Sequence, residues 1–196
     1  MRRTNRPRVL LGVCLTLAML PLHAEQAIFA SGCFWCTESD FEKVEGVSEA
    51  VSGYIGGSVE NPSYEAVSAG GTGHTEAVRV EFDPSVVSYE ELLDVYWRNV
   101  DPTTDDRQFC DRGRQYRPGI FPLNAAQREA AEASRQAIID AGEVSPVLVE
   151  ITPAGTFYEA EQYHQDYYKK NSLRYRYYRF ACGRDARLEE LWGEPG

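Results

Sequence analysis

Two cysteines separated by two residues are the side chains of this sequence best suited to chemistry. Cys33 and Cys36 follow a short apolar segment, residues 26–30, which predicts a buried strand, and the pair Ser31-Gly32, which predicts a tight turn. After the turn, apolar residues recur with helical spacing: Phe34, Phe41 and Val44. We therefore expect Cys33 at the N-terminus of a helix.

This expected position favours the thiolate form of Cys33. The unpaired backbone N–H groups and the positive end of the helix dipole stabilise a negative sulfur, and the thiolate is the nucleophilic form of cysteine. Cys36 follows one turn later on the same face, close enough for a disulfide with Cys33 if the first turn permits it. Two buried structural cysteines would show the same spacing, so the pattern alone leaves both interpretations open.

The first two dozen residues have the organisation of a secretory signal peptide. Four arginines precede an apolar run over residues 9–22, and Leu22-His23-Ala24 is a plausible cleavage site. The apolar run is too short for a comfortable membrane span. We therefore expect residues 1–24 to be removed and residues 25–196 to form one exported, periplasmic domain. An uncleaved N-terminal anchor is the alternative.

The expected mature chain is strongly acidic. Loss of residues 1–24 removes four arginines and leaves 16 Lys and Arg against 30 Asp and Glu, a net charge of −14. Nucleic acid and anionic lipid would repel this charge, so we expect neither a nucleic-acid partner nor a stable association with membranes. Four cysteines remain, and an even number in an oxidising compartment permits disulfides: Cys33, Cys36, Cys110 and Cys182. A chain of this size does not need disulfides for stability, which favours a redox role for some of them.

One carboxyl group lies on the apolar face of an expected strand. Residues 74–82 alternate so that Val78, Val80 and Phe82 share a face, and Glu76 has the same parity. Desolvation there would favour the neutral acid and raise the pKa of Glu76, as a proton donor near neutral pH requires. The alternative is that Glu76 lies beyond the edge of the sheet and is solvated.

The remaining elements indicate an α/β fold. We expect strands over residues 47–54 and 147–151, and helices over residues 88–99, 124–141 and from 159 onward. Ser88 and Glu91 match a capping box. The glycine-rich residues 69–73 are interpreted as a flexible entry to the next strand, residues 101–121 as a long functional loop, and the tyrosine-rich residues 175–180 as packed surface. Irregular alternation of this kind predicts an α/β sandwich with helices on a mixed or mainly antiparallel sheet.

Five separated motifs resemble, in this order, the A-type peptide methionine sulfoxide reductases. They are Gly32-Cys33-Phe34-Trp35, Gly53-Tyr54-x-Gly56-Gly57, Gly73-His74-x-Glu76-Ala77-Val78, Asp111-x-Gly113-x-Gln115-Tyr116-Arg117 and Glu161-x-Tyr163-His164-Gln165. The resemblance covers about residues 27–168. It implies a ferredoxin-like two-layer α/β sandwich and reduction of methionine S-sulfoxide, free or in proteins, in the repair of oxidative damage.

The resemblance also implies roles for individual residues. It makes Cys33 the nucleophile that attacks the sulfoxide sulfur, Glu76 the acid that protonates the sulfoxide oxygen, and Tyr64, Tyr116 and Asp111 polar members of the site. Phe34 and Trp35 become walls of the pocket for the substrate methyl group. The chemistry is consistent with these roles, because a sulfoxide oxygen leaves poorly until it is protonated and a methyl group binds well against aromatic rings. Ordinary core packing is the alternative for the two aromatic residues.

Turnover requires a second thiol to condense with the sulfenic acid left on Cys33. Many family members place that cysteine in a glycine-rich C-terminal tail, whereas this chain has a charged, tyrosine-rich, helical C-terminal segment. Cys182 and Cys36 are equal candidates for the resolving cysteine, ahead of Cys110. The resemblance implies a thioredoxin-like reductant and no metal or organic cofactor. Nothing in the sequence indicates an oligomer, so we expect a monomer.

Two other functions fit parts of the pattern. The first is a general dithiol-disulfide oxidoreductase that uses Cys33 and Cys36. The second is a metal-binding module with Cys33, Cys36, His74 and His164 as ligands, although the spacing from Cys36 to His74 is not that of a zinc finger.

Overall fold

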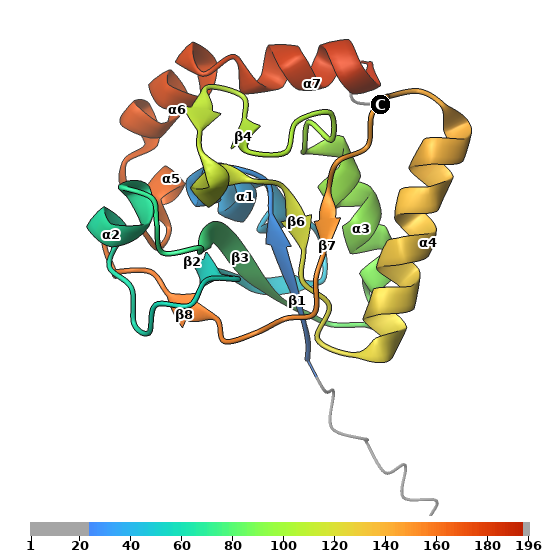
Figure 1. Ribbon diagram of the computed structural model, residues 1–196, viewed down its shortest axis with the longest axis horizontal. Helices are drawn as coiled ribbons and strands as arrows, with labels where there is room; N and C mark the ends of the chain where they lie inside the picture. Colours follow the sequence, from blue (N-terminus) through green and yellow to red (C-terminus); the bar gives the residue numbers. More distant parts are fainter. Residues whose placement is uncertain (1–23, 194–196) are drawn as a thin grey trace, which may run out of the picture.

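A six-stranded mixed sheet forms the centre of the computed structural model, which describes residues 24–193 (Figure 1). Its order is β7 (Glu150–Ile151), β6 (Gly119–Ile120), β1 (Glu25–Ala30), β3 (Thr75–Phe82), β2 (Val47–Ile55) and β8 (Tyr158–Glu159). Neighbouring strands are antiparallel except β6 and β7, which are parallel. A separate two-stranded ladder pairs β4 (Arg107–Gln108) with β5 (Asp111–Arg112). The expected mixed sheet with flanking helices is confirmed.

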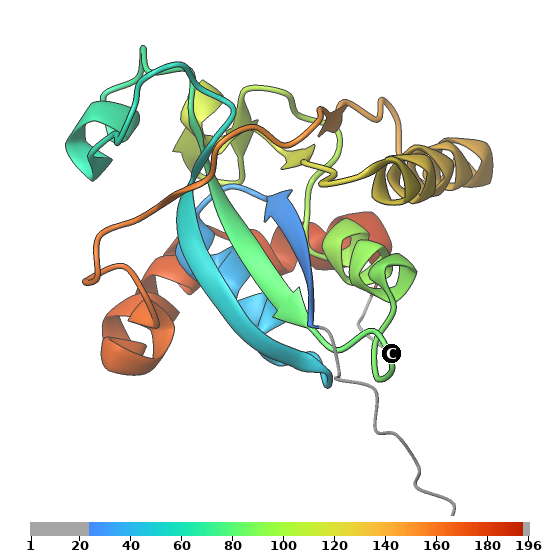
Figure 2. The ribbon, with the colours of Figure 1, turned by 90° about the horizontal axis from the view of Figure 1, so that it is seen from below.

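Seven α-helices surround this sheet in the described part of the chain. They are α1 (Phe34–Phe41), α2 (Tyr64–Ser68), α3 (Tyr89–Arg98), α4 (Ala125–Ala141), α5 (Tyr167–Lys170), α6 (Ser172–Ala181) and α7 (Arg184–Trp192), with a 3₁₀ turn η1 at Arg114–Tyr116. Helix α1 packs against the long central strands β1, β2 and β3, which lie side by side in Figure 2. Helices α6 and α7 follow one another along the top of Figure 1, beside β4.

Stacked aromatic rings form the core between α1, β1 and α3. The ring of Phe29 on β1 stacks on that of Phe41 at the end of α1, with centroids 4.8 Å apart, and on that of Tyr96 at 5.4 Å. The buried Tyr96 hydroxyl donates a hydrogen bond to the Ala30 carbonyl at 3.1 Å. These contacts fix the C-terminal end of β1, from which the chain enters the turn before Cys33.

Several predicted elements are confirmed and three are corrected. The capping box of Ser88 and Glu91 begins α3, and Asn124 caps α4. The strand predicted over residues 147–151 pairs only at its last two residues, in β7, and the loop over residues 101–121 contains β4, β5, η1 and β6. The helix predicted from residue 159 is wrong before Tyr167.

The reason is that this segment first pairs with the edge of the sheet and then forms turns up to Asp166. The backbone N–H of Ala160 donates to the Ser52 carbonyl at 2.9 Å, and the Gln165 side chain bonds both backbone groups of Ser52. Asp166 then adopts a φ of 54°, and a helix begins only at Tyr167. Hydrogen bonding along β2 therefore outweighs the helical spacing of the tyrosines.

The predicted signal peptide lies outside the described residues, apart from Ala24. No helix among residues 24–193 has the length and apolar character needed to cross a membrane.

Gly53 in β2 is expected to be essential for stability. A Cβ atom there would lie 2.4 Å from the Tyr158 carbonyl oxygen and 2.3 Å from the Phe157 ring, so β8 would have to separate from the sheet. Gly53→Ala should lower the free energy of unfolding by about 1–3 kcal/mol, the usual effect of overpacking. Urea denaturation measures this change. Gly155→Ala is the control, because its Cβ meets nothing within 4 Å, and equal stability of the two variants would contradict the prediction.

Candidate active site

A glycine turn places Cys33 at the start of α1, as the sequence predicted. Gly32 has a φ of +86°, and a Cβ atom on it would lie 2.6 Å from the Cβ of Gln108, so the turn requires glycine. Cys33 is the N-cap residue, and its carbonyl accepts the backbone N–H groups of Cys36 at 3.1 Å and Thr37 at 3.3 Å. The backbone therefore holds both cysteines in the first turn of the helix.

Both thiols are buried, and burial changes their ionisation. Cys33 is 8% exposed and Cys36 is 1% exposed. Burial raises the pKa of Cys33 well above its ordinary value, and the hydrogen bond with Cys36 adds to this rise. The same hydrogen bond lowers the pKa of Cys36, with help from the positive charges of Arg184 and Arg179. Burial thus opposes the thiolate that the helix terminus favours at Cys33.

Glu76 lies in β3 beside the start of α1. It is buried, and its Oε2 accepts a hydrogen bond from the backbone N–H of Phe34 at 3.0 Å. Burial raises the pKa of Glu76 to about 8, helped by the nearby negative charge of Asp111 and opposed by the Phe34 N–H. The prediction of a desolvated acid is confirmed, and the solvated alternative is wrong. At neutral pH a protonated carboxyl is therefore hydrogen-bonded to the backbone of Phe34, the residue that follows Cys33.

Two phenols and a second carboxyl complete the polar cluster. Burial raises the pKa of Tyr64 to about 12, and it raises that of Tyr116 as well. The charges of Glu76, Cys33 and Asp111 act on both phenols in the same direction. The structure thus brings together the polar residues singled out from the sequence, and both phenols keep their protons at neutral pH.

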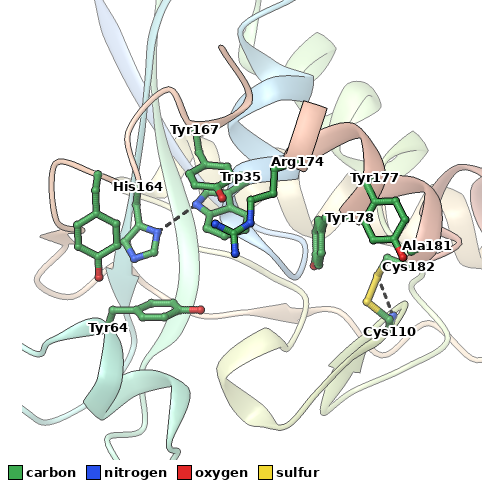
Figure 3. Close-up of a pocket in the computed structure, with 11 residues that line it drawn as sticks. Trp35, Tyr64, Cys110, His164, Tyr167, Arg174, Tyr177, Tyr178, Ala181 and Cys182 are labelled. Atoms are coloured by element: carbon green, nitrogen blue, oxygen red, sulfur yellow. Dashed lines mark hydrogen bonds between the residues drawn. A yellow bond between two sulfur atoms is a disulfide. The ribbon is translucent and has the colours of Figure 1, made fainter. Parts of the chain in front are cut away.

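An aromatic pocket of about 580 Å³ opens next to this cluster (Figure 3). Trp35 lines it, and its ring stacks on Tyr167 with centroids 3.7 Å apart. The Trp35 indole N–H donates to Nδ1 of His164 at 3.1 Å, which fixes the plane of the indole. Phe34 is buried in the core behind Trp35 and Tyr64 and is absent from the lining of this pocket.

Four residues hold this site together, and sequence reasoning gave none of them this role, although it named His164 as a possible metal ligand. Tyr178 lies edge-on to Trp35, and its hydroxyl donates to Oδ2 of Asp111 at 2.5 Å. The interpretation of residues 175–180 as packed surface is therefore wrong for Tyr178. Glu161 accepts the Tyr54 hydroxyl and the backbone N–H of Tyr64, each at 2.8 Å, and so positions α2. His164 and Tyr167 are the others, and the aromatic-rich sequence around them was the available signal.

A disulfide joins Cys110 to Cys182 and lies at the wall of the same pocket. It ties the connection between β4 and β5 to the end of α6, with Cα atoms 5.0 Å apart. Cys33 and Cys36 are free thiols. In this state Cys182, one of the two equal candidates for the resolving cysteine, is already paired, and Cys36 is the free thiol beside Cys33.

The proposed metal ligands do not come together as a site. Nδ1 of His74 accepts the Gly57 N–H at 3.1 Å and its Nε2 lies 2.8 Å from the Val59 carbonyl, so both ring nitrogens have partners. Nδ1 of His164 is occupied by Trp35. Among the described residues, neither group of side chains close enough to share a metal ion contains any of the four expected ligands. The metal-binding alternative is therefore wrong.

A pair of buried thiols, a protonated carboxyl, two phenols and an aromatic pocket on an α/β scaffold define a thiol-dependent oxidoreductase. This arrangement supplies a nucleophile, a proton donor and a second thiol within one site.

Comparison with known proteins identifies the family. The family model described as peptide methionine sulfoxide reductase matches residues 25–195. The peptide methionine sulfoxide reductase MsrA 2 of Caulobacter vibrioides is 52% identical over 86% of each chain. The MsrA/MsrB protein of Vibrio cholerae is also 52% identical over 86% of this chain, which spans 45% of that relative's length. The structure of reduced Mxr1 from Saccharomyces cerevisiae has a TM-score of 0.73 and 31% identity, covering 78% of this chain and 88% of that one.

The chain belongs to the peptide methionine sulfoxide reductase family and is an A-type member of it. It is accordingly an enzyme of methionine sulfoxide reduction and repair. This membership disfavours the general dithiol-disulfide oxidoreductase.

Proposed function

We propose that this protein reduces the S epimer of methionine sulfoxide, in peptides and as the free amino acid, with Cys33 as nucleophile and Glu76 as acid. The observation that carries the proposal is the hydrogen bond from Phe34 N–H to Oε2 of Glu76. It holds the carboxyl beside Cys33 and leaves the other oxygen, Oε1, to carry the proton. Since burial keeps this carboxyl protonated up to about pH 8, Glu76 is a neutral acid with a proton to donate when the substrate binds.

The first step transfers one oxygen atom from substrate to enzyme. The Cys33 thiol attacks the sulfoxide sulfur while Glu76 protonates the oxygen. The S–O bond of the substrate then breaks, the hydroxyl passes to the Cys33 sulfur and the thiol proton returns to Glu76, so the products are methionine and a sulfenic acid on Cys33. Tyr64 and Tyr116 donate hydrogen bonds to the oxygen as negative charge develops on it. Trp35, with Phe34 behind it, contacts the methyl group, and Asp111 remains a polar member of the site held by Tyr178.

The second step restores the enzyme through thiol exchange. Cys36 attacks the sulfur of the sulfenic acid, a bond forms between the two cysteine sulfurs, and water leaves. A thioredoxin-like dithiol then reduces this disulfide and is itself oxidised. Support for Cys36 over Cys182 is its free thiol and its hydrogen bond with Cys33.

We also propose that the domain has a ferredoxin-like core and is exported. Support for a ferredoxin-like core is the antiparallel order β6-β1-β3-β2, with α1 between β1 and β2 and α3 between β3 and β6. The arginine-rich start and apolar run of residues 1–24 support an exported domain over residues 25–196 that acts in the periplasm.

An assay of both sulfoxide epimers with dithiothreitol as reductant tests this function. We expect turnover of the S epimer and of S-oxidised peptides, and no turnover of the R epimer. Mass spectrometry after one equivalent of substrate without reductant should find a Cys33–Cys36 disulfide beside the existing Cys110–Cys182 bond. Turnover of the R epimer alone would contradict the stereochemical proposal, and a bond from Cys33 to Cys182 would contradict the assignment of Cys36.

A further inference from the structure

The C-terminal helices place two arginines beneath the pair of active-site thiols. Arg184, at the start of α7, is 1% exposed and donates to the Ser31 carbonyl at 2.9 Å and to the Asn99 carbonyl. Arg179, on α6, donates to Oδ1 of Asp40 at 2.7 Å. Nη2 of Arg184 lies 3.5 Å from the other oxygen of Asp40. Both guanidinium groups therefore converge on one carboxylate of α1.

Cys36 lies on the face of α1 toward which these arginines point. Asp40 is four residues after Cys36, so the two side chains are neighbours on one helix face. Tyr175 packs against Cys36, and its hydroxyl accepts a hydrogen bond from Arg179 at 3.0 Å. Ser31, whose carbonyl accepts a hydrogen bond from Arg184, is two residues before Cys33. The arginines thus contact the residues on both sides of the Cys36 thiol.

The buried charges of this cluster do not balance. Two guanidinium groups contact one buried carboxylate, Asp40, whose side chain is 6% exposed, while the half-buried Asp111 interacts with Arg184 through charge alone. The second acidic partner of Arg179, Asp185, is 65% exposed and is screened by solvent. Nε of Arg184 also has no hydrogen-bond partner. A buried positive charge requires a compensating negative one, and the Cys36 sulfur is the group placed to supply it.

We propose that Arg179 and Arg184 are positioning residues that hold the Cys36 sulfur as the attacking thiolate in the step that resolves the Cys33 sulfenic acid. This inference rests on the function proposed above. In that step the Cys36 thiolate forms the S–S bond, the S–O bond of the sulfenic acid breaks, and the leaving hydroxide takes a proton to become water. The helices that stand in place of a glycine-rich tail would then supply charge to a cysteine in α1 rather than a cysteine of their own.

Other ionisable groups face Cys36 and set the background for this effect. They are Cys33 and Asp40 from α1, Glu76 from β3, Tyr175, Tyr178 and Arg179 from α6, and Arg184 from α7. Asp40 and an ionised Glu76 oppose a thiolate, and the tyrosines are neutral at working pH. The two arginines are the cations of this set.

The test measures ionisation of Cys36 directly, by the ultraviolet absorbance of its thiolate against pH. The background is Cys33→Ser, in which Cys110 and Cys182 stay joined, and the double variant without Cys36 gives the blank. Arg179→Met should move the midpoint of Cys36 upward by about one pH unit, the usual effect of removing a nearby opposite charge. Arg179→Lys should restore most of the shift. Arg176→Met is the control, since it removes an exposed arginine from the same helix.

A kinetic measurement in the protein with all its cysteines tests the role of the arginines separately from the proposed reduction of methionine sulfoxide. After one equivalent of sulfoxide without reductant, Arg179→Met should release one methionine per enzyme, as the parent does. It should form its disulfide more slowly at pH 7, by up to about tenfold, because a shift of one pH unit changes the thiolate fraction by at most tenfold. Arg184→Lys keeps the positive charge, so it should slow disulfide formation less than Arg184→Met. It is used if Arg184→Met fails to fold. An unmoved midpoint in Arg179→Met with normal methionine release overturns this inference alone, whereas a parent protein that releases no methionine overturns the proposed function.

Discussion

Replacing Cys33 by serine is expected to abolish reduction of methionine sulfoxide. A serine hydroxyl at the start of α1 is far less nucleophilic than a thiol, and loss of an essential nucleophile lowers turnover by roughly a thousandfold or more. The measurement is methionine release from the S epimer with dithiothreitol. The same variant should show no new disulfide after exposure to substrate, because no sulfenic acid forms.

Cys36→Ser is the matched control for this variant, since it removes the neighbouring thiol from the same turn of α1. It should release one methionine per enzyme in the first turnover and then slow in recycling with a protein dithiol. Full turnover by Cys33→Ser would show that the nucleophile lies elsewhere.

Glu76→Gln is expected to slow the first step and to remove its dependence on pH near 8. The amide cannot donate an acidic proton, and loss of general acid catalysis lowers the rate by roughly a hundredfold or more. In the parent enzyme the rate of methionine release should fall as the pH rises through about 8, where Glu76 loses its proton. Single-turnover rates across this range are the measurement. A parent-like fall in the Gln variant would contradict the assignment.

Glu81→Gln is the control, because Glu81 lies on the same strand and its side chain bonds that of Gln26 on the exposed surface.

The stability of Glu76→Gln provides a second readout. The folded protein keeps the proton of Glu76 up to about pH 8, whereas the unfolded chain releases it near the ordinary pKa of 4.5. Between these values the folded state binds more protons, so the free energy of unfolding falls as pH rises, by at most about 1.4 kcal/mol per pH unit from this group. The fall should be shallower in the variant.

Local patterns were sufficient to predict the elements that carry the reaction. The turn before Cys33, the parity of Glu76 with Val78, and the capping box at Ser88 each depend on residues close in sequence, and each is confirmed. The ionisation of Cys33 was not predictable in this way. Helix position favours a thiolate, whereas burial of Cys33 raises its pKa, and burial depends on packing across the whole chain.

The other errors have the same origin in long-range contacts. Residues 160–166 have helical spacing, but hydrogen bonds from Ala160 and Gln165 to Ser52, more than a hundred positions earlier, hold them in turns beside the edge of the sheet. Tyr178 was assigned to the surface because nothing near it in sequence shows that Asp111 and Trp35 lie beside it. Pairing of Cys110 with Cys182 likewise needs the approach of α6 to β5.

The closed bond between Cys110 and Cys182 has a practical consequence for following this enzyme. In a chain that begins at residue 25, only two sulfhydryl groups remain for a colorimetric reagent after denaturation, those of Cys33 and Cys36. In the proposed mechanism, a first catalytic cycle without reductant consumes both. A simple titration of the denatured protein therefore reports directly what fraction of molecules has reacted.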